Sequence, residues 1–422
     1  MLKAVILVGG PSKGTRFRPL SLDIPKPLFP VAGLPIIQHH IRACVSVKGL
    51  KEILLIGYYP AKDLQEFIQS MIQEYKINIR YLQEFMALGT AGGMYHFRDQ
   101  IRSGNPEAFF VMNGDVCADF PLVEMLSFHK CRPQNALITV MATEATRQQA
   151  CNYGCIVMDK ETHEITHYVE KPSTFVSTLV NCGVYVFSLE IFQIMAEIFN
   201  RKNQEYYNCE EVMNGSAEES GRIRLEQEVL GPLAATGRAF VMHTTKWWSQ
   251  LKTAGAAIYA NRHYLQLYKS LNPELLKTDT QATTLPDVYI HPTADVHSTA
   301  VLGPNVSIAA NAVIGPGARI KESIVLEAAV IGDHSLVLHS IIGRRSQIGA
   351  WSRVEGTPND PNPNKPFAKM DNSPLFNKLG RLNPSITIVG CSVTVPDEIV
   401  LLNSIVLPYK ELTRSFKNEI IL

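Results

Sequence analysis

The sequence predicts two folds in one chain: an α/β doubly wound domain over residues 1–262, a linker over 263–287, and a left-handed parallel β-helix over 288–422. Two patterns support this division. In the first part, short apolar runs alternate with amphipathic stretches, which is typical of helices packed on a largely parallel sheet. In the second part, an aliphatic residue recurs at every sixth position, which is typical of a hexapeptide β-helix.

The elements of the first domain follow from this alternation. Its short apolar runs predict strands, and the amphipathic stretches between them predict helices. The predicted strands are Ala4–Val8, Ile53–Gly57, Ile79–Leu82, Phe109–Met112 and Leu137–Ala142, and the first predicted helices are Ile36–Val47 and Asp63–Glu74. In a sheet of this kind, ligands bind at the carboxyl ends of the strands.

The second domain is predicted from the spacing of its aliphatic residues, each of which should point into the coil. They are Ile290, Val296, Leu302, Ile308, Ile314 and Ile320, then, after a slip, Val330, Leu336, Ile342 and Ile348. Because such solenoids bury their repeats by stacking, we also expect self-association. A proline-rich insertion over 356–383 interrupts the period. It is either a tolerated surface loop or a functional one.

Composition excludes several classes of function. The chain has 40 basic and 39 acidic residues, a net charge of +1, which argues against a nucleic-acid partner. No apolar stretch is long enough to span a membrane, and no signal peptide is apparent. The eight cysteines lack zinc-site spacing, so we expect ordinary thiols and a cytoplasmic protein.

The opening of the chain predicts a phosphate-binding loop. The apolar run Lys3–Val8 breaks into the glycine-containing stretch Gly9–Gly14. Glycines let the backbone approach a phosphate, and Arg16, Arg18 and Lys26 supply positive charge. The order of residues fits neither a Walker A loop nor the dinucleotide-binding fingerprint.

This loop resembles the signature of the sugar-1-phosphate nucleotidyltransferases, in which a glycine-rich loop is followed by Pro-Lys-Pro. Later segments resemble further motifs of that family, in the family's order: Leu88–Gly93, Asn113–Val116, Tyr168–Pro172, Asn181–Tyr185 and Leu225–Glu228. With the solenoid, the resemblance covers nearly the whole chain. It implies a Rossmann-like nucleotidyltransferase domain.

The resemblance also implies a nucleotide-sugar site. Its glycine loop faces the phosphates, the polar pair after the third strand reads the base, and the later motifs hold the sugar. Carried over by motif, the site residues are Gly9, Gly10, Gln83, Glu84, Gly89, Thr90, Asn113, Asp115, Glu170, Lys171, Asn181, Gly183 and Trp248. In the family, the residue matching Asp115 ligates Mg²⁺.

The departures from the family pattern fall on residues that, in the family, contact the metal ion and the triphosphate. These enzymes stabilise the transition state with the glycine loop and with Mg²⁺ held by two carboxylates. Gln250 stands where the second carboxylate belongs, and a neutral amide is a poor Mg²⁺ ligand. The loop carries two extra residues, one of them the stiff Pro11, and Gln227 replaces a family lysine.

A site that keeps its ground-state contacts but loses its transition-state stabilisation should bind the product without making it. We therefore predict a nucleotide-sugar-binding pseudoenzyme with no catalytic residues and no required cofactor. Asp115 remains as a candidate Mg²⁺ ligand. The alternative is an active guanylyltransferase that uses one carboxylate and a repositioned loop.

Within the family, the chain resembles the regulatory branch that accompanies a catalytic mannose-1-phosphate guanylyltransferase. This resemblance implies a catalytic beta subunit as partner and GDP-mannose as an allosteric ligand that mediates feedback inhibition. It also implies that the insertion 356–383 reaches the partner's active site.

Two alternatives belong to other classes of function. Hexapeptide solenoids often carry acyltransferase chemistry, for which His291, His297, His334 and His339 are candidate general bases. More often a histidine in a repeat turn is merely solvated or hydrogen-bonded. The other alternative is a structural scaffold with an empty pocket.

Overall fold

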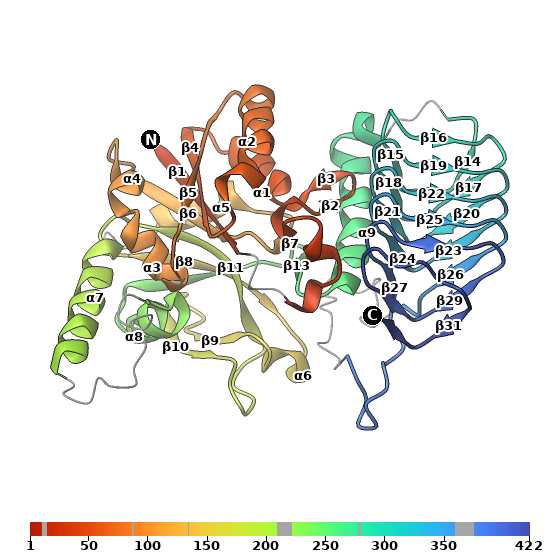
Figure 1. Ribbon diagram of the computed structural model, residues 1–422. Coiled ribbons are helices and arrows are strands. Elements are labelled where there is room, and N and C mark those ends of the chain that lie inside the picture. Colours follow the sequence, from red (N-terminus) through yellow and green to blue (C-terminus); the bar gives the residue numbers. More distant parts are fainter. Residues whose placement is uncertain (11–14, 87, 134, 209–221, 277–279, 359–374) are drawn as a thin grey trace. The chain divides into compact units, whose positions relative to one another are not determined.

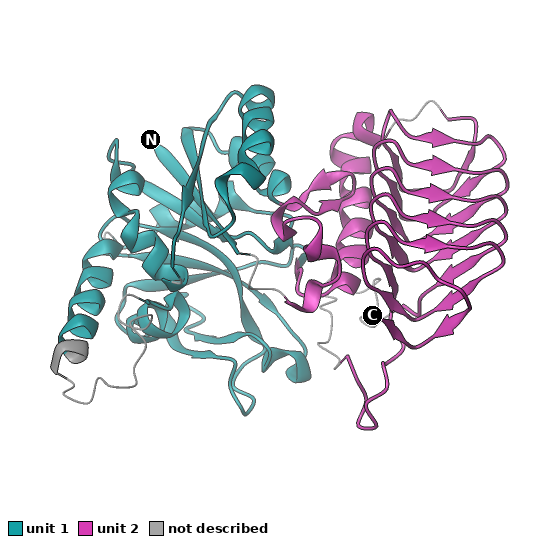
Figure 2. Ribbon diagram, in the orientation of Figure 1, with its two compact units in different colours: residues 1–13, 37–248 teal, residues 14–36, 249–422 magenta. Residues whose placement is uncertain are grey.

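A computed structural model describes residues 1–10, 15–86, 88–133, 135–208, 222–276, 280–358 and 375–422. The chain forms two compact units (Figure 2). The first comprises Met1–Lys13 and Ile37–Trp248, and the second comprises Gly14–Ile36 and Ser249–Leu422. This division differs from the sequence-based boundaries, because residues 14–36 and 249–262 group with the β-helix.

The first unit is built on a mixed sheet whose strands run in the order β10-β9-β11-β6-β1-β4-β5, with β8 beside β11 and β12 beside β8 (Figure 1). The strands β6, β1, β4 and β5 are parallel, as predicted, whereas β11 pairs antiparallel with β6. The strands are β1 (Leu2–Gly9), β4 (Leu50–Gly57), β5 (Asn78–Gln83), β6 (Ala108–Asn113), β8 (Ile138–Glu144), β9 (Gly154–Met158), β10 (Ile165–Glu170), β11 (Leu179–Phe187) and β12 (Ala239–His243).

Helices fill the connections between these strands. They are α1 (Ile36–Val45), α2 (Ala61–Tyr75), α3 (Gly89–His96), α4 (Arg98–Arg102), α5 (Leu122–Lys130), α6 (Arg147–Ala150), α7 (Ile191–Asn208) and α8 (Gly231–Leu233), with a π-helical turn, η4, at Leu225–Leu230. One core cluster joins central strand residues such as Val5 and Val111 to Met94 of α3 and Met195 of α7. The first two helices and the first strands lie where the sequence predicts them.

A buried ion pair joins the neighbouring strands β1 and β4. The Lys3 side chain is 1% exposed, and its Nζ lies 2.7 Å from Glu52 Oε2 and donates a hydrogen bond to the Gln100 carbonyl. Glu52 also accepts hydrogen bonds from Arg80 and Asn78. Each charge therefore has several partners, which is what allows a lysine to be buried.

Unit 1 also contains a buried histidine, His129, with a polar partner at each ring nitrogen. His129 Nδ1 lies 2.8 Å from Thr139 Oγ1, and Nε2 lies 3.1 Å from Ser188 Oγ. Because Ser188 donates its own proton to the Ala136 carbonyl, it accepts from His129 Nε2. Burial lowers the pKa of His129 from 6.5 to about 4, so the folded protein holds this ring neutral.

We expect this histidine to make folding stability fall in mild acid. Between pH 6.5 and about 4 the unfolded chain takes up a proton that the folded His129 refuses, so the free energy of unfolding decreases as the pH is lowered. The full loss is on the order of 3 kcal/mol. About 2 kcal/mol of it should be lost between pH 7 and pH 5, which urea unfolding at those two pH values measures. His129→Gln should show a smaller pH dependence. Equal pH dependence in both proteins would contradict the assignment.

The second unit contains a parallel β-helix. Its coils are stacked on one another (Figure 1), and their strands form three parallel sheets. Each sheet takes the name of its first strand. The β14 sheet comprises β14 (Thr283–Thr284), β17 (Val301–Leu302), β20 (Arg319–Lys321), β23 (Leu336–Leu338), β26 (Arg353–Glu355), β29 (Val400–Leu402) and β31 (Phe416–Lys417). The β15 sheet comprises β15 (Val288–Ile290), β18 (Val306–Ile308), β21 (Ile324–Val325), β24 (Ser340–Ile342), β27 (Thr387–Val389), β30 (Ile405–Val406) and β32 (Ile420–Ile421). The β16 sheet comprises β16 (Asp295–Val296), β19 (Val313–Ile314), β22 (Val330–Ile331), β25 (Gln347–Ile348) and β28 (Thr394–Val395).

The predicted inward positions are right before the slip and partly wrong after it. Ile290, Ile308 and Ile314 belong to the buried core of the coil. Val330 and Leu336 do not, and the fully buried Ile331 and Val337 take their places. The coil shortens by one residue at this point, since Ile308 pairs with Ile290 eighteen residues earlier but with Val325 seventeen residues later. A shift of one residue turns a strand side chain to the opposite face.

The outer face of the β15 sheet is covered by helix α9 (Ala254–Leu271), which also packs against β2 (Pro30–Val31) of the described segment 15–36. The fully buried Asn261 joins all three parts. Its Oδ1 accepts hydrogen bonds from the Ala32 amide at 2.8 Å and from Ser307 Oγ at 2.6 Å, and its Nδ2 donates to the Asn305 carbonyl at 3.4 Å. The segment 15–36 is thus fixed to the β-helix from within.

Candidate functional site

Three of the predicted site residues of unit 1 lie at the carboxyl ends of its parallel strands. Gly9, Gln83 and Asn113 end the parallel strands β1, β5 and β6. Backbone hydrogen bonds tie these ends together, from Tyr58 to the Gly9 carbonyl at 2.7 Å and from Gly114 to the Leu7 carbonyl at 2.9 Å. Gly10 follows β1, whereas Pro11–Gly14 of the predicted phosphate loop lie outside the described residues.

Gln83 and Glu84, the pair predicted to read the base, lie where β5 leads toward α3. The side-chain oxygen of Gln83 accepts a hydrogen bond from the first amide of α2, at Ala61. The amide of Glu84 donates to the Gly57 carbonyl at 2.7 Å, and its carboxylate lies against Gly93 of α3. Gln83 is therefore engaged in this structure with the backbone of a neighbouring helix.

The turn that opens α3 is closed by the chain just before η4. Gly89 has a φ of +77°, and a side chain there would meet the Ile223 carbonyl at 2.5 Å. The amides of Ala91 and Gly92 donate to that same carbonyl. A carbonyl on the first turn of a helix occupies donors that a ligand anion could otherwise use.

Glu226, which the sequence analysis did not single out, contacts the predicted site residue Thr90. Its carboxylate accepts a hydrogen bond from Thr90 Oγ1 at 3.3 Å, and Thr90 in turn accepts one from the Leu225 amide. Burial raises the pKa of Glu226, and the charge of Glu170 raises it further, against the opposing effect of Lys171. Its position in the Leu225–Glu228 motif could have identified it from the sequence.

The sugar-side network, defined as Asn181, Tyr185, Tyr168, Glu170 and Lys171, is fully connected. Asn181 Nδ2 donates to the Tyr185 hydroxyl at 2.8 Å and to the Tyr168 hydroxyl at 3.3 Å. Tyr168 donates to Glu170 at 2.8 Å, and Lys171 Nζ lies 3.3 Å from the other Glu170 oxygen. Burial raises the pKa of both tyrosines well above the usual value, so they remain neutral donors.

This network adjoins the end of β6 through Gly183. Asn181 Oδ1 accepts from the Gly183 amide, and Gly183 has a φ of +72°. A side chain at Gly183 would lie 2.5 Å from Asn113 Nδ2, so the motif glycine allows the two strands to approach. Trp248 donates to the Cys182 carbonyl at 2.8 Å and packs edge-on against Tyr153. The sugar-side residues and Asn113 are therefore brought together.

The residues present fit a Mg²⁺ site poorly. Asp115 follows β6 and is half-buried. Gln250, the last residue of β13 (Trp248–Gln250), belongs to the second unit and brings an amide where the family has a carboxylate. Within the described ranges, no three His, Cys, Asp or Glu side chains lie close enough to share a metal ion. A single carboxylate is a weak donor set for Mg²⁺.

Two positively charged residues of the predicted phosphate-binding segment are assigned to the second unit. Arg16 and Arg18 belong to the second unit, where both line a pocket. Gln227, at the position of a family lysine, is exposed and accepts a hydrogen bond from Arg224. Of the predicted insertion 356–383, residues 359–374 lie outside the described part of the chain.

The four solenoid histidines are held by local contacts. His291 and His297 each accept a hydrogen bond from the backbone amide two residues on, at Thr293 and Thr299. His334 stacks on Trp351 with ring centroids 4.4 Å apart. Burial lowers the pKa of His339. These contacts are those of turn residues rather than of a catalytic pair.

Comparison with protein families matches both units. A family model described as nucleotidyl transferase matches residues 3–227, and one described as the GMPPB C-terminal domain matches 284–421. A crystal structure assigned as a glucose-1-phosphate thymidylyltransferase from Bacillus anthracis, in complex with sucrose, has a TM-score of 0.49 at 20% identity and covers 62% of this chain and 94% of its own. The mixed sheet with its motifs at the strand ends thus defines a nucleotidyltransferase-type domain.

Relatives that match over their whole length place the chain in a narrower group within this class of protein. The chain is 63% identical over 439 residues to a Drosophila melanogaster protein named mannose-1-phosphate guanylyltransferase regulatory subunit alpha, and 58% identical over 425 residues to its Xenopus tropicalis namesake, each match covering both chains completely. The chain belongs to the nucleotidyl transferase family and, within it, to the group of mannose-1-phosphate guanylyltransferase regulatory alpha subunits. Among the described residues, no helix has the length and apolar character to cross a bilayer.

Proposed function

We propose that this protein is a non-catalytic, cytoplasmic subunit that binds GDP-mannose and mediates feedback inhibition of a catalytic beta subunit of mannose-1-phosphate guanylyltransferase. The observation that carries the proposal is that the motifs predicted to hold the sugar are intact, whereas the motif predicted to hold the metal ion is not. The sugar-side network is complete and hydrogen-bonded, whereas an amide, Gln250, replaces the second carboxylate. The names of the full-length relatives support the regulatory role.

The sugar-side network suits recognition of the product's hydroxyls and phosphate. Glu170 and Lys171 present an acceptor and a cation side by side, held by the Tyr168 hydroxyl. Hydrogen bonds to charged groups contribute about 1.5–3 kcal/mol each, enough to give selectivity to a nucleotide-sugar site. Such ground-state contacts bind a product without accelerating its formation.

Feedback requires that the ligand bind one conformational state better than another, with a coupling of about 1–3 kcal/mol. A nucleotidyltransferase-type site that no longer catalyses the reaction can still be specific for GDP-mannose, the product of the catalytic subunit. In the proposal, the insertion 356–383 is the element that reaches the partner, and self-association through the solenoid supports the assembly.

Calorimetry with GDP-mannose tests the ligand. The full chain should bind it, and Lys171→Ala should weaken binding about tenfold or more, because a charge-assisted contact to the phosphate is lost. Lys160→Ala, which removes another exposed lysine of the same unit, is the matched control and should bind normally. No heat of binding in the unmodified protein would contradict the proposal and leave a structural scaffold.

Pyrophosphate release tests the alternative, an active guanylyltransferase. With GTP, mannose 1-phosphate and Mg²⁺, the isolated chain should give no release above background. Added to a catalytic beta subunit, it should make that subunit's turnover sensitive to GDP-mannose. Robust turnover by the isolated chain would overturn the pseudoenzyme assignment.

A further inference from the structure

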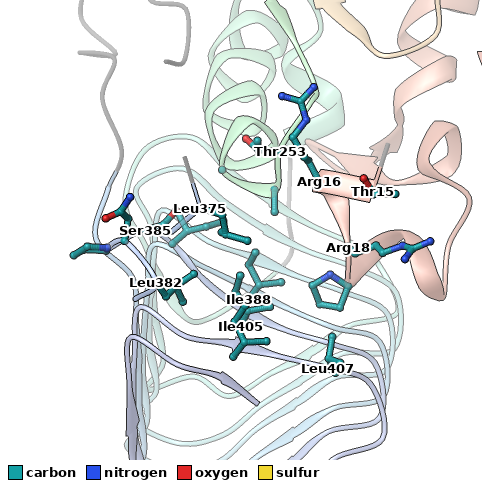
Figure 3. Close-up of a pocket in the computed structure, with 17 residues that line it drawn as sticks. Thr15, Arg16, Arg18, Thr253, Leu375, Leu382, Ser385, Ile388, Ile405 and Leu407 are labelled. Carbon is teal, nitrogen blue, oxygen red and sulfur yellow. The ribbon is translucent and has the colours of Figure 1, made fainter. Parts of the chain in front are cut away.

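The second unit contains a pocket whose lining includes none of the predicted nucleotide-sugar-binding residues. It has a volume of about 290 Å³ and is lined only by residues of that unit (Figure 3). Ligand pockets in proteins begin at about this size.

The floor of this β-helix pocket is an apolar row on the outer face of the β15 sheet. Ile388, Ile405 and Ile420 stand in register on the neighbouring strands β27, β30 and β32. Their neighbours Val389 and Val406 point into the coil, so the row must point outward. Helix α9 covers the earlier part of this face and begins at the pocket, where Ala254 lines it.

Two segments distant in sequence form the side walls. Pro19 comes from the signature segment after the glycine loop, and Leu375 and Leu382 come from the foot of the insertion. The foot is a small hairpin, in which Phe376 bridges to Leu382 and the Asn383 amide donates to the Leu375 carbonyl at 2.9 Å. In Figure 3, Leu375, Leu382, Ile388 and Ile405 converge on one space.

The margin of the pocket is positively charged. Arg16 and Arg18 line it, and Figure 3 shows their guanidinium groups extending away from the apolar floor. No Asp or Glu is among the described residues that line the pocket. Both arginines are exposed, and within the described part of the chain neither has an acidic partner. An apolar floor with unpaired guanidinium groups at its edge is complementary to an amphipathic anion.

We propose that the β-helix pocket binds a small amphipathic anion. An aliphatic body packs on Ile388, Ile405 and Leu382, and a phosphate or carboxylate head lies at Arg16 and Arg18. Because the walls come from the signature segment and from the foot of the insertion, such a ligand holds these two segments together.

Calorimetry on the full chain tests the ligand class with four probes: octyl phosphate, octanoate, 1-octanol and inorganic phosphate. An octyl anion should bind at least tenfold more tightly than octanol or inorganic phosphate, and the tighter of the two anions identifies the head group. The surface variant R16A/R18A should lose about tenfold in affinity for that anion and keep its affinity for octanol. Equal binding of the anions and octanol would overturn the proposal.

A second pair of variants locates the site. Leu407 lines the pocket and is half-buried, and Leu407→Glu would place a carboxylate beside the head group. The matched control is Leu402→Glu, at a half-buried leucine of the β14 sheet that does not line the pocket. The anion should bind L407E at least tenfold more weakly and L402E within twofold of the unmodified protein. GDP-mannose titrations of both variants should stay unchanged, so this proposal can fail independently of the proposed function. Equal affinity of the anion for both variants would refute the pocket as the site.

Discussion

Replacement of Glu52 by Gln should lower the free energy of unfolding of the first unit by about 3–5 kcal/mol, because it leaves the charge of Lys3 buried without its counter-ion. Lys3 is 1% exposed and has Glu52 and one backbone carbonyl as its described polar contacts. Urea unfolding, monitored together with hydrogen exchange of β1 and β4, measures the loss. Burial alone would raise the pKa of Glu52, but Lys3 and Arg80 lower it overall, so the effect should fade as the pH drops below the ordinary value of 4.5.

The exposed pair Lys130–Glu107 is the matched control. Its charges are 3.0 Å apart, and each side chain is 49% exposed. Glu107→Gln should cost less than about 1 kcal/mol, because water screens such pairs. The apolar double variant K3M/E52L should recover much of the stability lost in E52Q. Equal losses in E52Q and E107Q would contradict a special role for burial.

Asn261→Leu should destabilise the second unit by about 2–4 kcal/mol. The substitution removes the partner of the buried Ala32 amide and of Ser307, and an unpaired buried polar group costs about 1–3 kcal/mol. Hydrogen exchange in α9 and in residues 15–36 should rise, and the urea transition of this unit should move to lower concentration. The exposed Gln266 on the same helix supplies the control, since Gln266→Leu should change the stability by less than about 0.5 kcal/mol. Similar losses in both variants would refute the role assigned to Asn261.

Local patterns predicted most of the fold. The first strand was expected at Ala4–Val8 and is found at Leu2–Gly9, and the second helix was expected at Asp63–Glu74 and is found at Ala61–Tyr75. Period alone failed at Val330 and Leu336, because the coils that begin at Ile308 and at Val325 are each seventeen residues long rather than eighteen. Nothing in a hexapeptide count marks where each residue is lost. Nor could spacing show that residues 14–36 group with the β-helix, since that depends on the long-range contacts of Asn261.

The sequence predicted those residues of the candidate site that belong to recognisable family motifs. Asn181, Glu170 and Lys171 were expected to lie together, and the structure connects them through Tyr168. The resemblance did not indicate that Thr90 contacts Glu226 or that Ile223 closes the α3 turn, because these contacts join segments more than 130 residues apart. The ligand itself remains a prediction.

The grouping of Gly14–Ile36 with the β-helix bears on how this gene can change over evolutionary time. A recombination event that exchanged the solenoid alone would leave Asp23 without Arg344 and Arg345, its ionic partners. It would also leave Asn261 without Ser307, its hydrogen-bond partner on the β-helix. Residues 14–36 and the β-helix should therefore be inherited together from the same ancestor. Across lineages, a substitution at Asp23 should be accompanied by one at Arg344 or Arg345.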